Sequence, residues 1–124
     1  MNYPVASIVA VNTISAVVLI VTIVANLGIA LADFASAKFV LKNSAEVDVS
    51  TKWLPILGAL KAAGAVGLLL GLLGVRPIGI AAALGLVAFF IGAVATHVRA
   101  RVFYNIAFPM AYLALAIASL VVLL

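Results

Sequence analysis

Four long apolar runs, each about as long as a bilayer-spanning helix, make up most of this chain. They cover about residues 4–32, 53–74, 77–97 and 104–124, and short polar breaks separate them. A helix needs about 20 apolar residues to cross a hydrocarbon layer of about 30 Å. Of the 124 residues, 69% are hydrophobic and only 8% are charged, whereas soluble domains carry about 25% charged residues. The pattern therefore predicts an integral membrane protein.

Helices are the spanning form that this pattern favours. A lone strand in lipid would leave its backbone groups without hydrogen bonds, and these Gly- and Ala-rich runs lack the alternation of a barrel strand. The segment Gly74–Pro77 predicts a tight turn between the second and third runs. We therefore expect an all-α fold, a four-transmembrane-helix up-down bundle that forms a single membrane domain over residues 1–124. Pro109 lies inside the fourth run and predicts a kink that frees the carbonyl of Asn105.

The loop of about residues 33–52 is the one sizeable polar segment. Its first part, from Asp33 to Lys42, keeps a helical composition, which predicts that the first helix continues or bends into an interfacial helix. Asn43 and Ser44 then predict the end of that helix.

The basic residues predict the orientation in the membrane. Cytoplasmic loops carry an excess of Lys and Arg, and the two loops expected on one side hold five of them: Lys38, Lys42, Lys52, Arg99 and Arg101. The other side holds Arg76. We therefore expect a multi-pass membrane protein, with both long loops in the cytoplasm and both termini outside. Because the basic residues flank apolar segments, their role in orientation is a better explanation of the charge of +4 than nucleic-acid binding.

The composition also limits the chemistry. The chain has no Cys and one His, so it predicts no thiol redox centre, no metal site and no intrinsic cofactor. Small residues in the second run include the pair Gly67 and Gly71, which is typical of close helix packing. That pair favours packing within the bundle, and a homodimer through the same glycines is the alternative.

Three ionisable side chains are expected at one end of the bundle. Lys61 lies about two helical turns inside the second run, where an unpaired charge costs about 2.5–3.5 kcal/mol on insertion scales. Asp33 ends the first run and His97 ends the third, so an antiparallel bundle places both on the same membrane side as Lys61. We treat the three as candidate acid–base catalytic residues that border one polar pocket. The alternative is that Lys61 snorkels, His97 accompanies the topogenic arginines and Asp33 caps a helix.

Further polar residues follow one face of the first run. Asn12, Thr22 and Asn26 predict a face turned into the bundle, and with Arg99 they are candidate substrate-binding residues. Their alternative role is hydrogen bonding between helices, which contributes about 0.6 kcal/mol per contact on average.

The chain resembles the DoxX and DoxX-like family of small four-span bacterial membrane proteins. The resemblance rests on Phe34 and Lys38 at the close of the first run, on LGALKAAGAVGLLLGL from Leu57 to Leu72, and on GLVAFFIGAVATHVRAR from Gly85 to Arg101. Some family members resemble partners of membrane-associated redox complexes, and the family name derives from quinol-linked oxidoreductase components.

The resemblance implies a partner or small subunit in redox or quinone-linked membrane chemistry. Its electron carrier would be a bound quinone or would belong to a membrane oxidoreductase partner. The alternative hypothesis is a membrane-embedded isomerase, cyclase or hydrolase that acts on a lipophilic molecule between the helices. Whether the chain is an enzyme stays open at this stage.

Overall fold

The computed structural model describes residues 5–124, with side chains from residue 13 onward, and all regular structure in this part is helical. In chain order the elements are α1 (Val5–Phe34), α2 (Lys38–Glu46), the 3-10 helix η1 (Thr51–Trp53), α3 (Leu54–Leu72), α4 (Arg76–Ala100) and α5 (Ala107–Leu123). The predicted all-α fold is confirmed.

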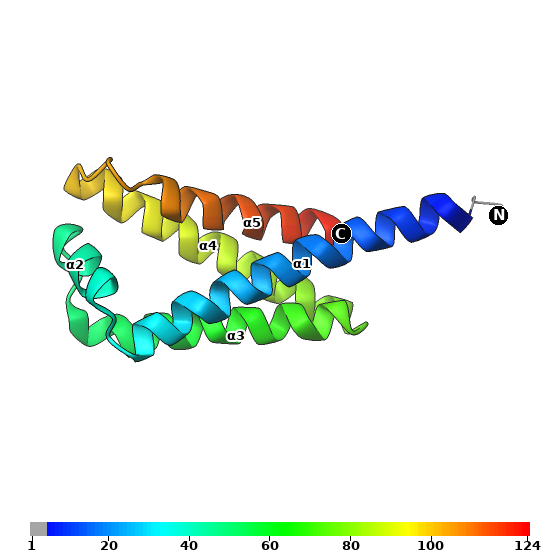
Figure 1. Cartoon of the computed structure of the whole chain (residues 1–124), viewed down its shortest axis with the longest axis horizontal. Helices are drawn as coiled ribbons and strands as arrows, with labels where there is room; N and C mark the ends of the chain where they lie inside the picture. Colours follow the sequence, from blue (N-terminus) through cyan, green and yellow to red (C-terminus); the bar gives the residue numbers. More distant parts are fainter. Residues whose placement is uncertain (1–4) are drawn as a thin grey trace.

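The four longer helices form an up-down bundle, in which each runs antiparallel to the one before it (Figure 1). Helix α1 packs against α3 and α5, and α4 closes the ring by packing against both of them as well. The short helix α2 lies across one end of the bundle, whereas the C-terminal end of α5 and the N-terminal end of α1 lie at the other (Figure 1). The predicted tight turn joins α3 to α4, where Gly74 adopts a φ of +112° that favours glycine.

Length and hydropathy make this bundle a multi-pass membrane protein. Segments of 22, 22 and 25 residues in α1, η1–α3 and α4 are long and apolar enough to cross a bilayer. Helix α5 has 17 residues, which gives about 25 Å at 1.5 Å per residue and is near the shortest span that a bilayer accepts. Large apolar side chains cover the outer faces of the helices: Leu31 is 67% exposed and Phe108 is 72% exposed. Such faces match lipid rather than water.

The predicted kink at Pro109 is wrong, because α5 begins at Ala107 and not at residue 104. Pro109 therefore lies in the first turn, where a helix tolerates a missing N–H. The carbonyl of Asn105 is not freed either, since it accepts the backbone N–H of Phe108 at 3.1 Å.

The connection between α1 and α3 contains the short helix that was predicted, but this helix ends later than expected. The interruption falls after Phe34, at Ser36, whose φ of 51° is left-handed. Helix α2 then passes through Asn43 and Ser44 and ends at Glu46. The hydroxyl of Ser44 donates to the carbonyl of Val49 at 2.6 Å, so this side chain ties the helix to the following loop instead of ending it.

Small residues bring α3 and α4 together in the half of the bundle away from α2. A Cβ added at Gly67 would lie 2.5 Å from the Cβ of Ala82, and one added at Gly71 would lie 2.7 Å from the Cα of Gly79. These glycines therefore pack inside the bundle, as the first interpretation held. Helix α4 covers both glycines in this fold, and a homodimer through Gly67 and Gly71 stays a prediction.

The same half of the bundle holds the hydrophobic core. Its buried members come from all four long helices: Leu19, Ile23, Ala65, Leu68, Ala83, Leu86, Phe90, Ala116 and Leu123. Hydrogen bonds join α5 to α1 and to α4 beside this core. Ser119 donates to the hydroxyl of Thr22 at 2.8 Å, and Arg76 Nε donates to the carbonyl of Leu123 at 2.6 Å at the C-terminal end of α5. This half is therefore closely packed and cross-linked.

Candidate functional site

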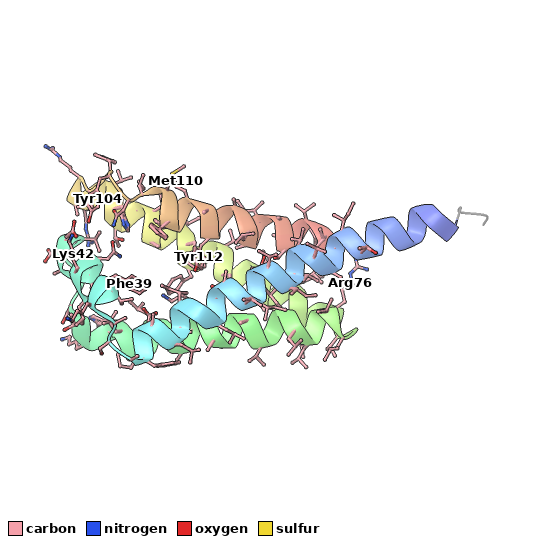
Figure 2. The ribbon with its side chains drawn as sticks, viewed as in Figure 1. Phe39, Lys42, Arg76, Tyr104, Met110 and Tyr112 are labelled. Carbon is pink, nitrogen blue, oxygen red and sulfur yellow. The ribbon has the colours of Figure 1, made fainter. Side chains whose placement is uncertain are left out.

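The half of the bundle next to α2 is hollow. It contains a cavity of about 1060 Å³ whose walls come from α1, α3, α4 and α5, with α2 across its end. On α1 the lining runs from Val24 to Asp33, which corresponds to about 14 Å along the axis. Figure 2 shows Phe39 of α2 and Tyr112 of α5 extending into this part of the molecule, and both line the cavity. The cavity therefore reaches from α2 to about half the thickness of a bilayer.

An ion pair joins α1 to α3 in this cavity. Lys61 Nζ lies 2.6 Å from Asp33 Oδ2, and the two side chains are 9% and 3% exposed. Side chains tilt toward the N-terminus of their own helix, so the lysine reaches from its deeper position on α3 back toward α2 and the aspartate. Gly58 lets α1 approach closely here, because a Cβ at this position would lie only 3.0 Å from the Cβ of Asp33. Lys61 thus ends on a buried carboxylate rather than at the membrane surface, which is how the fold offsets the cost of its charge.

An aromatic ring of α4 lies beside the ammonium group of Lys61. Lys61 Nζ lies 5.3 Å from the centroid of Phe89, close enough for a cation–π interaction. The ring of Phe89 meets that of Phe90 edge to face at 5.0 Å, and Phe90 contacts the ring of Tyr112 at 5.2 Å. The wall beside the ion pair is therefore flat, apolar and aromatic.

His97 lies on the same cavity and is 4% exposed. Its Nδ1 is 3.0 Å from the carbonyl oxygen of Ala93. A carbonyl only accepts hydrogen bonds, so Nδ1 carries a hydrogen. Among the described residues Nε2 has no hydrogen-bond partner.

Two side-chain hydrogen bonds hold α2 against the loop between α4 and α5. Tyr104 donates to Glu46 Oε1 at 2.7 Å, and Asn105 Nδ2 donates to Asn43 Oδ1 at 3.1 Å. The first of these bonds raises the pKa of the Tyr104 phenol, because the carboxylate stabilises the protonated form. In Figure 2 Tyr104 lies over α2, close to Lys42. These contacts close the α2 end of the cavity.

The structure brings Asp33, Lys61 and His97 together on one cavity, but it places the other candidate residues elsewhere. Thr22 and Asn26 are fully buried and are not among the residues that line the cavity; Asn26 Nδ2 donates to the carbonyl of Thr22 at 2.9 Å. Arg99 is exposed on the outside of α4. The side chain of Asn12 lies outside the described residues. The catalytic and binding roles of all seven stay predictions.

Sequence reasoning missed several cavity residues. The two bonded pairs that hold α2 in place, the aromatic wall at Phe89 and Phe90, and Tyr112 were not singled out. Polar residues in two loops expected on one membrane side were a usable signal for Tyr104 and Asn105. Phe89 and Phe90 carried no such signal, because aromatic residues are common on lipid-facing helices too.

Metal ligands are not gathered at this site. The described part of the chain contains no group of three or more His, Asp or Glu side chains that could hold an ion. The arrangement instead suits an organic molecule with a large apolar part and a small polar end, since ligand pockets are mostly apolar with a few placed polar groups.

Comparison with known proteins agrees with this membrane bundle. The sequence profile of the DoxX-like family matches residues 7–119. The chain belongs to the DoxX-like family. No curated protein and no solved structure gives a significant match. The matched segment of this DoxX-like protein includes the ion pair, His97 and the aromatic wall.

Proposed function

We propose that this DoxX-like protein binds a lipophilic quinone-type carrier and serves as a partner subunit in quinone-linked redox chemistry of a bacterial plasma membrane. The observation that carries the proposal is the cavity, in which an apolar, aromatic wall lies directly beside the Asp33–Lys61 ion pair. A quinone ring has the same division, with an apolar body and oxygen atoms that accept hydrogen bonds from an ammonium group.

The size and position of the cavity support this ligand class. Its volume of about 1060 Å³ is at the upper end of the roughly 300–1,000 Å³ of small-molecule sites. Gly28 lines it on α1, and a Cβ added there would meet no atom within 4 Å. We infer that an isoprenoid tail extends from the cavity into the lipid on this side, between α1 and α5.

The side chains of this protein do not supply the electrons, so another molecule must supply them. With no Cys and one His, the protein offers neither a thiol couple nor the ligands for a haem held by two histidines. The proposed role is therefore to hold the carrier near a membrane oxidoreductase, which supplies or removes the electrons.

Binding to the purified protein tests this proposal. The protein in lipid nanodiscs is titrated with a short-tail ubiquinone analogue, and quenching of the single Trp53 or calorimetry reports the complex. We expect saturable binding that weakens at least about tenfold when Lys61 is replaced by Met, since a hydrogen bond to a charged group is worth about 1.5–3 kcal/mol. Val98→Ala, an exposed site outside the cavity, is the matched control. Binding that is absent, or unaffected by Lys61→Met, contradicts the proposal.

The partner role has its own test in cells. Native membranes that carry the tagged protein are solubilised mildly, and the co-purified proteins are identified. A deletion strain is then assayed for quinone reduction. We expect an oxidoreductase in the pull-down and slower quinone reduction in the deletion strain. If neither result is obtained, the redox role is excluded.

A second function is favoured by one specific observation. Lys61, Asp33 and His97 are acid–base groups that line the same cavity. The second proposal is therefore a membrane-embedded isomerase, cyclase or hydrolase that acts on a lipophilic substrate. This function requires that a co-purified lipid or isoprenoid is chemically converted. Turnover that survives both Lys61→Met and His97→Ala excludes these residues as its catalysts.

A further inference from the structure

Most of the basic side chains lie on the surface of the bundle end that α2 covers. We propose that the outer face of α2, which carries Lys38 and Lys42, binds the headgroups of anionic phospholipids. This lipid-binding surface goes beyond the proposed quinone site, and its existence does not depend on a quinone being the ligand of the cavity.

The distribution of charge between the two ends of the bundle is uneven. Of the seven Lys and Arg residues, five are exposed at the α2 end, on α2, on η1 or at the C-terminal end of α4: Lys38, Lys42, Lys52, Arg99 and Arg101. Of the other two, Lys61 is paired with Asp33 inside the cavity, and Arg76 lies at the opposite end. Two acidic side chains, Asp48 and Glu46, remain against the five basic ones. The surface at the α2 end is therefore positively charged.

Helix α2 presents two of these basic residues on one face. Lys38 and Lys42 are four residues apart, so they are neighbours on the helix surface, with about 5–6 Å between their Cβ atoms. Both are exposed, and neither forms an ion pair within the described part of the chain. The opposite face carries the buried side chains Val40, Ser44 and Val47. Two ammonium groups at this spacing can donate to the same phosphate group.

Exposed aromatic side chains indicate that this face lies at the level of the lipid headgroups. Trp53 of η1 and Tyr104 of the loop between α4 and α5 are both exposed, and Trp and Tyr are enriched at membrane–water interfaces. Lys52 Nζ lies 5.9 Å from the centroid of the Trp53 ring, and Figure 2 shows Lys42 at the same end as Tyr104. Basic side chains at this level meet lipid phosphates. An anionic lipid surface therefore explains the charge better than an acidic protein does.

Quenching of the single tryptophan, Trp53, tests the proposal. Helix α2 contacts η1, which contains Trp53, so brominated lipids that bind to α2 should reduce its fluorescence. The protein is reconstituted in phosphatidylcholine vesicles with increasing fractions of brominated phosphatidylglycerol, and a parallel series uses brominated phosphatidylcholine. We expect phosphatidylglycerol to be preferred by about tenfold or more, since one basic side chain near an anionic membrane changes the affinity by roughly fivefold. High salt should reduce the preference, because it screens exposed charges.

Paired substitutions assign the preference to α2. The variant with Lys38→Met and Lys42→Met loses both charges, and we expect its preference for phosphatidylglycerol to fall by at least about fivefold. The variant with Lys38→Arg and Lys42→Arg keeps both charges and is the matched control, so it should keep the preference. Both side chains are exposed, and circular dichroism checks that each variant is folded. The comparison of the two lipids on the wild-type protein does not depend on either variant.

Three outcomes would overturn the proposal. One is equal quenching of the wild-type protein by the two brominated lipids. Another is a preference that survives in the folded methionine variant, because the anionic lipid then binds elsewhere on the protein. The third is an absent lipid preference together with an acidic protein that co-purifies from native membranes with the wild-type chain but not with the methionine variant, which would make the α2 face a protein-docking surface. No quinone is present in the vesicles, so the result is independent of the proposed function.

Discussion

Replacing Lys61 by Met tests the feature on which the site depends most, the buried ion pair. Met keeps most of the unbranched stem but removes the charge, and it leaves the Asp33 carboxylate, only 3% exposed, without its partner at 2.6 Å. Removal of one member of a buried pair costs about 3–5 kcal/mol. Loss of the contact with the Phe89 ring adds about 0.5–1 kcal/mol. We therefore expect Lys61→Met to lower the free energy of unfolding by about 3.5–6 kcal/mol.

The double-mutant cycle with Asp33→Asn isolates the pair itself. Asp33→Asn alone strands the ammonium group and should be destabilising by a similar amount. In the double variant neither charge remains, so much of the loss should return, with a coupling energy of about 0.5–3 kcal/mol.

The assay is reversible unfolding in mixed micelles with increasing sodium dodecyl sulfate, followed by circular dichroism. Lys38→Met removes an equally basic but exposed side chain of α2 and should change the free energy of unfolding by no more than about 0.5 kcal/mol. If the effects of Lys61→Met and Asp33→Asn add within about 0.3–0.5 kcal/mol, the two charges do not interact in the membrane. Lys61 would then be a snorkelling residue.

Other regions of the bundle give three further expectations. Gly71→Ala should destabilise the protein by about 1–3 kcal/mol, because the new methyl would lie 2.7 Å from the backbone of α4. Gly85→Ala, whose methyl would meet no atom within 4 Å, should be neutral or stabilising. Equal melting temperatures for the two variants would contradict the packing described. Ser119→Ala should cost about 0.6 kcal/mol in the same assay through its lost hydrogen bond to α1, and a cost near zero would show that water replaces this bond. We also expect that a cysteine at the exposed Ala45 of α2 reacts with an impermeant thiol reagent only in opened cells, as the positive-inside rule requires; labelling in intact cells would reverse the orientation.

Local sequence determined the helices and their order. The apolar runs predicted all four long helices, because hydropathy and span length are properties of consecutive residues. The turn at Gly74 and the placement of Lys61, Asp33 and His97 at one end also followed, since alternating direction puts every second helix end on the same side. The sequence also favoured the packing of Gly67 and Gly71 within the bundle.

Local patterns misplaced the helix ends. The kink expected at Pro109 is absent because α5 starts only at Ala107. A proline in the first turn of a helix is tolerated, whereas a proline one turn further along would kink the helix. The helix end expected at Asn43 and Ser44 falls instead at Glu46, whereas the bend that leads into α2 lies at Ser36. Proline and polar residues bias the backbone, but hydrogen bonds to neighbouring segments decide where a helix stops.

Only the tertiary structure decided which side chains meet. Lys61 could reach the surface or a carboxylate, and it is the close approach of α1 at Gly58 that puts Asp33 at 2.6 Å. The cavity likewise arises because small residues draw α3 and α4 together at one end while α2 covers the other, with Tyr104 and Asn105 bonded across. The rotation and crossing angles of helices depend on contacts between residues far apart in the chain. The hydropathy pattern along the sequence does not report these contacts.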